Sequence, residues 1–263
     1  MARPAKVRLD RLLVERGLAP TRSVATGCIL AGRVFSGEQR LDKPGLALAV
    51  DTPLSVRELP RYVSRGGQKL EGALLDLSVE VTGLTCLDIG ASTGGFTDCL
   101  LQHGAARVYA VDVGRGQLAH RLTLDARVIN REGVNARRLT REDFPDPIDL
   151  VVLDASFIGL SKLIGAVAAV LPVRGRLLAM IKPQFEAGPE LATRYRGVIK
   201  DETLRQQIIG DVIAGVARSG FEVLGSRDSR LAGPKGNLEH FVLAERSSGV
   251  VPPSEPPPEA THA

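Results

Sequence analysis

The sequence predicts an α/β protein with a mostly parallel sheet of seven strands, the last one antiparallel, preceded by a small α+β unit. Five short apolar runs alternate with helical patterns, which is typical of a parallel sheet covered on both faces. They are TCLDIG, RVYAVDV, ARVIN, IDLVVLD and RLLAMIKP. Two more runs, FEVLGSR and LEHFVLAE, follow a helical segment at 202–218 and predict a hairpin at the edge of the sheet.

Composition narrows the class of protein. The 263 residues are 44% hydrophobic, enough for one α/β domain and a small companion. No apolar run approaches the roughly 20 residues of a membrane span, and the basic N-terminus lacks the apolar core of a signal peptide. Cys28, Cys86 and Cys99 form no CxxC pair, so we expect buried thiols in a reducing cytoplasm and neither a disulfide framework nor a metal site.

The small unit is predicted to span residues 1–59. One amphipathic helix in LDRLLVERGL closes near Gly17, and a second in TRSVATGCILAG is N-capped by Thr21 and ended by Gly32. Short strands follow in RVFS, ALAV and LSVREL. The chain through Lys69 is rich in Lys and Arg, whereas the remainder after Lys69 is net acidic, which favours a polyanion-binding module over a merely solvated basic surface.

Three further boundaries follow from composition. Residues 60–67 contain Pro and a Gly pair and are expected to connect the two parts. The large domain then covers 68–246, with its first helix starting near Gln68. The Pro- and Ser-rich tail, 247–263, has little to bury and is expected to be disordered.

A glycine-rich turn, GASTGG, joins the first strand of the sheet to a helix, so free N–H groups and the helix dipole point at one spot. Its G-x-x-x-G-G spacing fits neither a dinucleotide fingerprint nor a P-loop. Asp88 can meet an ammonium group, the turn amides a carboxylate, and Asp112 two ribose hydroxyls, which together favour S-adenosylmethionine. The alternative is a structural turn with Asp88 as a helix cap. The expected cofactor-binding residues are Asp88, Gly90, Ser92, Thr93, Gly94, Gly95, Phe96, Asp112, Asn135 and Asp154.

Four charged residues are predicted to meet beside this turn. Asp154 and Lys182 end the fourth and fifth strands, at the sheet edge where ligands bind. Lys69 precedes the first strand and Glu239 begins the last. A desolvated lysine beside a second cation releases its proton readily, so it can take the proton of a ribose 2′-hydroxyl as the oxygen attacks a sulfonium methyl group. Two structural ion pairs are the alternative interpretation.

Six segments carry a family resemblance: SRGGQKL, CLDIGASTGGFTDCLL, VDVGRGQL, DLVVLDASFIGL, IKPQFE and GPKGNLEHF. In these the chain resembles the TlyA (haemolysin-A-like) family of rRNA methyltransferases. Its catalytic part is similar to the FtsJ-type ribose 2′-O-methyltransferases, and their Lys-Asp-Lys-Glu set falls on Lys69, Asp154, Lys182 and Glu239. The resemblance implies a Rossmann-like class I fold, S-adenosylmethionine as donor, and a cytidine 2′-hydroxyl in 16S and 23S rRNA, or in 23S rRNA alone. It makes Lys182 the expected base, Asp154 and Lys69 its positioning partners, and Glu239 the residue that orients the lysines and the hydroxyl.

The N-terminal segments RLDRLLVERGLAPTRSVA, AGRVF and LDKPG resemble the RNA-binding domain shared with ribosomal small-subunit protein four. The GEQR stretch departs from the short NG-type turn that such domains often carry. The resemblance implies ribosomal RNA or ribosomal subunits as partners, with no role for DNA or a membrane. The expected RNA-binding residues are Arg3, Lys6, Arg22, Arg33, Lys43 and Arg65.

The sequence departs from the family pattern at two further places and leaves alternative functions open. AGPE follows KPQFE, where the family often has Val-Gly and then a basic residue that is expected to contact a phosphate. Because that basic residue is missing here, the nearby Arg194, Arg196 and Lys200 are expected to supply the phosphate contact. Tyr62 stands where some members have tryptophan. A base-methylating enzyme would commonly show a Pro-Pro-Tyr-like turn after the fourth strand; here ASF follows Asp154. A non-catalytic rRNA-binding protein stays possible, whereas a haemolysin and an NAD-dependent oxidoreductase are disfavoured.

Overall fold

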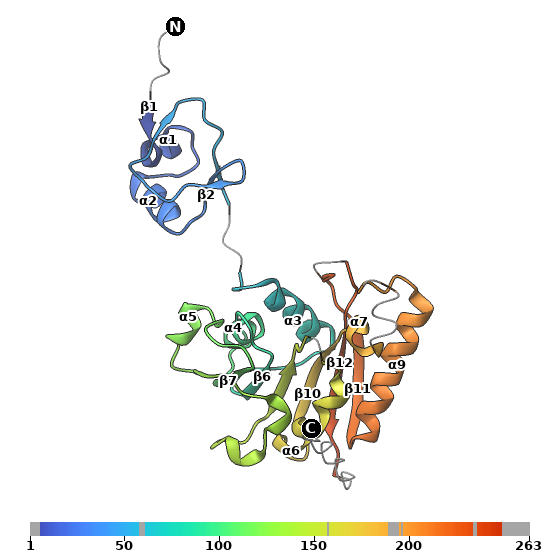
Figure 1. The fold of residues 1–263 in the computed structure, drawn as a ribbon. Helices are drawn as coiled ribbons and strands as arrows, with labels where there is room; N and C mark the ends of the chain where they lie inside the picture. The colour runs from blue at the N-terminus through green and yellow to red at the C-terminus, as the bar shows by residue number, and fades with distance from the viewer. Residues whose placement is uncertain are drawn as a thin grey trace, which may run out of the picture. The chain divides into compact units, whose positions relative to one another are not determined.

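The computed structural model divides the chain into two compact units, Met1–Arg61 and Tyr62–Ala263 (Figure 1). The residues that it describes are 6–57, 61–156, 158–188, 195, 197–233 and 236–248. Several sequence-based expectations therefore lie outside the described residues. They concern Arg3, Arg194, Arg196 and residues 249–263 of the tail.

The small unit contains two helices and short strands, as the sequence predicts. Its elements are β1 (Lys6–Arg8), α1 (Leu9–Glu15), α2 (Arg22–Leu30), β2 (Val34–Ser36), β3 (Gln39–Arg40), β4 (Ala47–Ala49) and β5 (Ser55–Val56). Strand β1 pairs antiparallel with β4, and β2 lies between β3 and β5. Thr21 caps α2 as predicted, because its Oγ1 accepts a hydrogen bond from the Val24 N–H at 3.3 Å. Leu9, Leu13 and Ile29 fill a separate small core.

The large unit is built on a seven-stranded sheet, which confirms the predicted fold class. Its strands are β6 (Thr85–Ile89), β7 (Arg107–Asp112), β8 (Val128–Glu132), β9 (Leu150–Leu153), β10 (Arg176–Ile181), β11 (Phe221–Asp228) and β12 (His240–Arg246). They lie in the order β11-β12-β10-β9-β6-β7-β8, and β12 runs antiparallel to both neighbours. The last hairpin therefore closes one edge of the sheet, as expected from the two late apolar runs.

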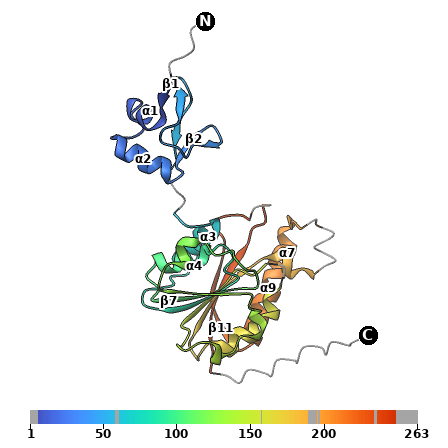
Figure 2. The same cartoon turned by 60° about the vertical axis from the view of Figure 1, so that its left-hand side comes forward.

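Helices cover both faces of this sheet (Figure 2). On one face lie α3 (Arg65–Asp76), α4 (Gly95–Gln102) and α5 (His120–Thr123), and on the other α6 (Ile164–Val170) and α9 (Glu202–Arg218). Strand residues alternate between the two cores: Leu87 and Ile89 face α6 and α9, whereas Cys86 faces α3 and α4. The remaining short elements are α7 (Pro183–Glu186), η1 (Ala136–Arg138), η2 (Arg141–Asp143) and η3 (Leu160–Lys162).

The segment expected to connect the units is more ordered than the sequence suggests. Helix α3 begins at Arg65, not near Gln68, because Ser64 caps it and accepts a hydrogen bond from the Gly66 N–H at 3.3 Å. Tyr62 is buried, and its ring occupies the space where a Cβ on Gly67 would lie. The glycine pair thus permits close packing inside the first helical turn as well as a bend.

The structure also shows the state of the three cysteines and the character of the helices. Cys28, Cys86 and Cys99 are all buried and free, and burial raises the pKa of the Cys86 thiol, which therefore stays protonated. None of the helices in the part of the chain that the structure describes combines the length and apolarity needed to cross a bilayer.

Candidate active site

The glycine-rich turn between β6 and α4 has a left-handed backbone at three positions, with φ of +84° at Gly90, +48° at Ser92 and +92° at Gly94. Gly90 is required by packing, since a Cβ there would lie 2.8 Å from the Asp154 carbonyl oxygen. Ser92 holds its unusual conformation through a 2.8 Å hydrogen bond from its N–H to Asp112 Oδ2. The turn is therefore pressed against the loop that follows β9 and is tied to the end of β7.

A cavity of about 430 Å³ opens beside this turn. Its lining residues are Ser64, Arg65, Gly66, Lys69, Gly90, Ala91, Ser92, Thr93, Gly95, Phe96, Asp154 and Ser156. Six of the expected cofactor-binding residues line it, whereas Asp88, Gly94, Asp112 and Asn135 are not among its lining residues. Four other lining residues were not predicted from the sequence, namely Ser64, Gly66, Ala91 and Ser156, and Arg65 was expected to contact RNA.

Asp88 lies behind the turn and has no exposed surface. Its Oδ2 accepts a 2.6 Å hydrogen bond from the Thr97 hydroxyl, while Oδ1 has no hydrogen-bond partner in the part of the chain that the structure describes. Burial raises the pKa of Asp88 to about 7, and the nearby Asp154 carboxylate adds to the effect. An unfilled buried acceptor beneath the N–H groups of a helix start fits a ligand with both an ammonium and a carboxylate group.

Two of the expected cofactor-binding residues, Asp112 and Asn135, lie near the ends of the neighbouring strands β7 and β8. Asp112 ends β7, where its oxygens accept hydrogen bonds from Ser92 N–H at 2.8 Å and Gly114 N–H at 2.7 Å. Asn135 follows β8 and caps η1, accepting from the Arg137 N–H at 3.1 Å. Each carboxylate oxygen of Asp112 retains acceptor capacity, so the residue fits a pair of ribose hydroxyls.

The structure brings together the four charged residues singled out from the sequence. Lys69, on α3, forms a buried ion pair with Glu239, which directly precedes β12. Lys182, after β10, lies 2.5 Å from Asp154 Oδ1, after β9. The exposed fractions of Lys69, Lys182 and Glu239 are only 7%, 8% and 3%.

The two ion pairs form one electrostatic group. Burial raises the pKa of Asp154, while the positive charges of Lys182 and Lys69 oppose that rise and the charge of Glu239 adds to it. Asp154 therefore responds to all three partners at once. Such a water-poor cluster, open to a cavity on one side, can hold a lysine in position to exchange a proton with a ligand.

Ser156 contacts this cluster and was not predicted. Its Oγ accepts a hydrogen bond from Lys182 Nζ at 2.8 Å, and the residue lines the cavity. It lies two positions after Asp154, on the same loop. One sequence signal was present for Ser156, its place two residues after Asp154 in the DAS segment. The contact with Lys182 could not be predicted, because it depends on how the loop folds.

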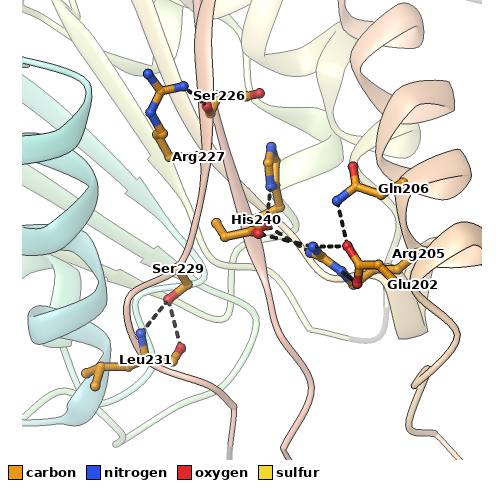
Figure 3. A network of polar contacts seen from close by, with 9 residues as sticks. Glu202, Arg205, Gln206, Ser226, Arg227, Ser229, Leu231 and His240 are labelled. Carbon is orange, nitrogen blue, oxygen red and sulfur yellow. Dashed lines mark hydrogen bonds and ion pairs between the residues drawn. The ribbon is translucent and has the colours of Figure 1, made fainter.

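A second polar network surrounds His240, the first residue of β12 and the neighbour of Glu239 in the sequence (Figure 3). Arg205 on α9 is 4% exposed and donates to Asp228, at the end of β11, through two hydrogen bonds of 2.8 and 3.1 Å. His240 Nδ1 lies 2.6 Å from Asp228 Oδ1, and Arg205 also pairs with Glu202. Since side chains alternate along a strand, His240 faces α9 while its neighbour Glu239 faces α3.

The residues expected to bind RNA are divided between the units. Lys6 and Lys43 are exposed on the small unit. Arg22 donates to the buried Asp10 at 2.9 Å, and Arg33 donates to the Arg57 carbonyl at 3.0 Å. Arg65, by contrast, lies in the large unit, where it donates to the Ala232 carbonyl at 2.7 Å and lines the cavity.

In the small unit, the buried Asp10 carboxyl is held by two arginine side chains. Hydrogen bonds from Arg8 and Arg22 lower the pKa of the buried Asp10 carboxyl, although burial itself opposes that effect. Arg22 therefore has a structural partner in addition to its exposed surface.

Lys200 belongs to the large unit, where it was expected to supply a phosphate contact. It is exposed and lies two residues before the start of α9.

Comparison with known proteins matches both units to families. Residues 62–246 match the family model of FtsJ-like methyltransferases, and residues 7–51 match the S4 domain. The chain is 45% identical over 240 residues to YqxC of Bacillus subtilis, named as an rRNA methyltransferase, covering 90% of this chain and 85% of YqxC. It is 43% identical over 244 residues to TlyA of Mycobacterium tuberculosis, named as a 16S/23S rRNA (cytidine-2′-O)-methyltransferase, covering 92% of this chain and 90% of TlyA. A solved protein from Streptococcus thermophilus, named as a hemolysin, shares 39% identity with a TM-score of 0.70, over 94% of this chain and 90% of the other.

Proposed function

Because this chain belongs to the FtsJ-like methyltransferase family, we propose that it transfers the methyl group of S-adenosylmethionine to the 2′-hydroxyl of a cytidine in ribosomal RNA. The observation that carries the proposal is the buried cluster of Lys69, Asp154, Lys182 and Glu239 beside the glycine turn. A sugar hydroxyl needs a base and close orientation to react at neutral pH, and this cluster offers both.

The walls of the cavity fit the donor. The glycine turn and the start of α4 would present N–H groups to an amino-acid carboxylate, while Asp88, which does not line the cavity, is buried behind the turn. Asp112 would accept the ribose hydroxyls, with Asn135 close to the next strand end. S-adenosylmethionine supplies, when bound, an electrophilic sulfonium methyl group, whose carbon–sulfur bond breaks as the new oxygen–carbon bond forms.

The cluster assigns a task to each side chain. Lys182 in its neutral form takes the proton of the 2′-hydroxyl, and Asp154 holds the amine 2.5 Å away. Lys69 brings a second positive charge, which stabilises negative charge on the ribose oxygen. Glu239 fixes Lys69 through their ion pair. The shielded position of the cluster excludes water, which would otherwise compete for the proton.

The small unit supplies affinity for the RNA. It matches the S4 domain, and the first part of the chain has the basic excess expected of a phosphate-binding surface. We therefore propose that this unit docks on ribosomal RNA, within a ribosomal subunit, in the cytoplasm. The relative from Mycobacterium tuberculosis carries the 16S/23S cytidine specificity in its name, which supports the choice of nucleotide.

A transfer assay tests this function. The protein would be incubated with methyl-labelled S-adenosylmethionine and, separately, small subunits, large subunits and bare rRNA that lack ribose methylation. Label in 2′-O-methylcytidine is expected, at a phosphodiester that becomes resistant to alkali because its 2′-hydroxyl is blocked. Label on a base would indicate a base methyltransferase, and binding without transfer to any of these RNAs would indicate a non-catalytic rRNA-binding protein.

A further inference from the structure

The loop that follows β9 presents two acceptors to one amine. Lys182 Nζ lies 2.5 Å from Asp154 Oδ1 and donates to Ser156 Oγ at 2.8 Å. Both acceptors line the cavity, whereas Lys182 is 92% covered. The nitrogen is thus held between two oxygens that lie two residues apart.

The first two residues of this loop, Asp154 and Ala155, pack against the glycine turn. A Cβ on Gly90 would lie 2.8 Å from the Asp154 carbonyl oxygen and 3.3 Å from Ala155 Cα, so the loop backbone packs directly against the glycine turn. The Asp154 N–H also donates to the Ile89 carbonyl at 3.0 Å. The backbone that carries Asp154, two residues before Ser156, is therefore positioned by the same turn that lines the cavity.

Two acceptors are enough to fix the direction of the lone pair on a neutral lysine amine. A lysine ammonium has three N–H donors, but the neutral amine has two and one lone pair. If Asp154 and Ser156 each take one donor, the lone pair of the neutral amine can only point along the one remaining direction. With Asp154 alone, the amine could rotate and point its lone pair elsewhere.

We propose that Ser156 is a positioning residue for Lys182, and that its hydroxyl fixes the direction of the amine lone pair toward the ribose 2′-hydroxyl. This inference rests on the proposed function. In the step itself the ribose O–H bond breaks and its proton passes to Lys182 Nζ, while the oxygen forms a bond to the methyl carbon and the electron pair of the carbon–sulfur bond stays on sulfur. Ser156 takes no proton; it accepts one hydrogen bond from Lys182 before and after the transfer.

Three variants of the full-length protein test the proposal. Ser156→Ala removes the acceptor, Ser156→Thr keeps a hydroxyl, and Ser161→Ala is the matched control, an exposed serine on η3 of the same connection. Single-turnover methyl transfer to rRNA would be measured from pH 6 to 10, with S-adenosylmethionine affinity from calorimetry. The pH series also covers titration of Lys69, Asp154 and Glu239, which surround Lys182.

For Ser156→Ala we expect transfer to fall about tenfold to a hundredfold, a part of the usual contribution of a general base, with unchanged affinity for the donor. The loss should persist at high pH, where the amine is neutral but misdirected, while Ser156→Thr stays closer to wild type and Ser161→Ala matches it. Recovery of Ser156→Ala at high pH, wild-type rates in it, weakened donor binding, or equal losses in the Ala and Thr variants would each overturn the inference. An inactive wild type would instead contradict the proposed function, and this inference with it.

Discussion

Lys69 and Glu239 lie 170 residues apart in the chain, yet they form an ion pair that is almost wholly buried at the carboxyl edge of the sheet. The pair joins α3, at the beginning of the large unit, to the last strand at its end. Burying two charges costs desolvation free energy, which their mutual attraction and hydrogen bonds must offset, so a buried pair is weak evidence of a role in stability.

The first prediction concerns this pair. Glu239→Gln removes the ion-pair partner of the buried Lys69 ammonium, so we expect the free energy of unfolding to drop by about 3 kcal/mol and methyl transfer to be lost. The double variant Lys69→Met/Glu239→Met removes both charges and should regain most of the stability while remaining inactive. Thermal unfolding and transfer assays measure the two effects; a double variant that is active would contradict the assigned roles.

A second prediction concerns Asp88 and pH. Its pKa of about 7 in the folded protein lies above the unfolded value of about 3.9, so the folded state binds the proton more tightly across that window. The free energy of unfolding should therefore fall as pH rises from 4 to 7, by on the order of a few kcal/mol from this group. Asp88→Asn cannot ionise and should flatten that dependence, whereas the exposed Asp211→Asn should keep the wild-type slope. Equal slopes in Asp88→Asn and wild type would show that Asp88 is ionised throughout.

A third prediction tests the network behind Glu239. Arg205→Met removes two hydrogen bonds to Asp228 and should lower the free energy of unfolding by about 2 kcal/mol, with a loss of kcat as the hairpin end shifts. Arg246→Met, at the far end of β12, is the matched control, because Arg246 bonds to the Leu171 carbonyl away from the site. Guanidinium unfolding curves and steady-state kinetics compare them. A similar kcat loss in both variants would mean that any weakening of the strand suffices.

A fourth prediction concerns RNA affinity. Lys43 is exposed on the small unit, and Lys43→Ala should weaken rRNA binding while reducing the slope of log affinity against log salt by about 1. Arg218→Ala removes the same charge from the exposed end of α9 in the large unit and should leave the slope unchanged. Binding titrations at several salt concentrations give both slopes. An unaltered slope in Lys43→Ala would remove this residue from the phosphate-contacting surface.

Much of the fold follows from local sequence patterns. The helix at 202–218 and the seven strands have clear periodicity and turn signals, and parallel order places Asp154 and Lys182 at one sheet edge. Strand β1 was not predicted, because Lys6–Arg8 is short and mostly charged and is a strand only through its pairing with β4. The early start of α3 was missed because it depends on the Ser64 cap and on Tyr62 packing against Gly67.

The parts of the site that were not predicted depend on contacts between distant residues. Ser156 meets Lys182 across 26 positions, and Arg205 meets Asp228 across 23. No periodicity or motif encodes either contact, since one depends on how the loop after β9 folds and the other on how α9 packs against β11. For Asp88 the position near the end of a strand could be predicted from the sequence, but its complete burial behind the turn could not.

The central claim is that Lys182 takes the proton of the ribose hydroxyl within an assembled donor site. Lys182→Ala is therefore the most direct test, with S-adenosylmethionine binding followed by calorimetry and methyl transfer to rRNA followed by label in 2′-O-methylcytidine. We predict donor affinity within about threefold of wild type and a fall in transfer of at least about a hundredfold. Transfer by Lys182→Ala at the wild-type rate would contradict the claim.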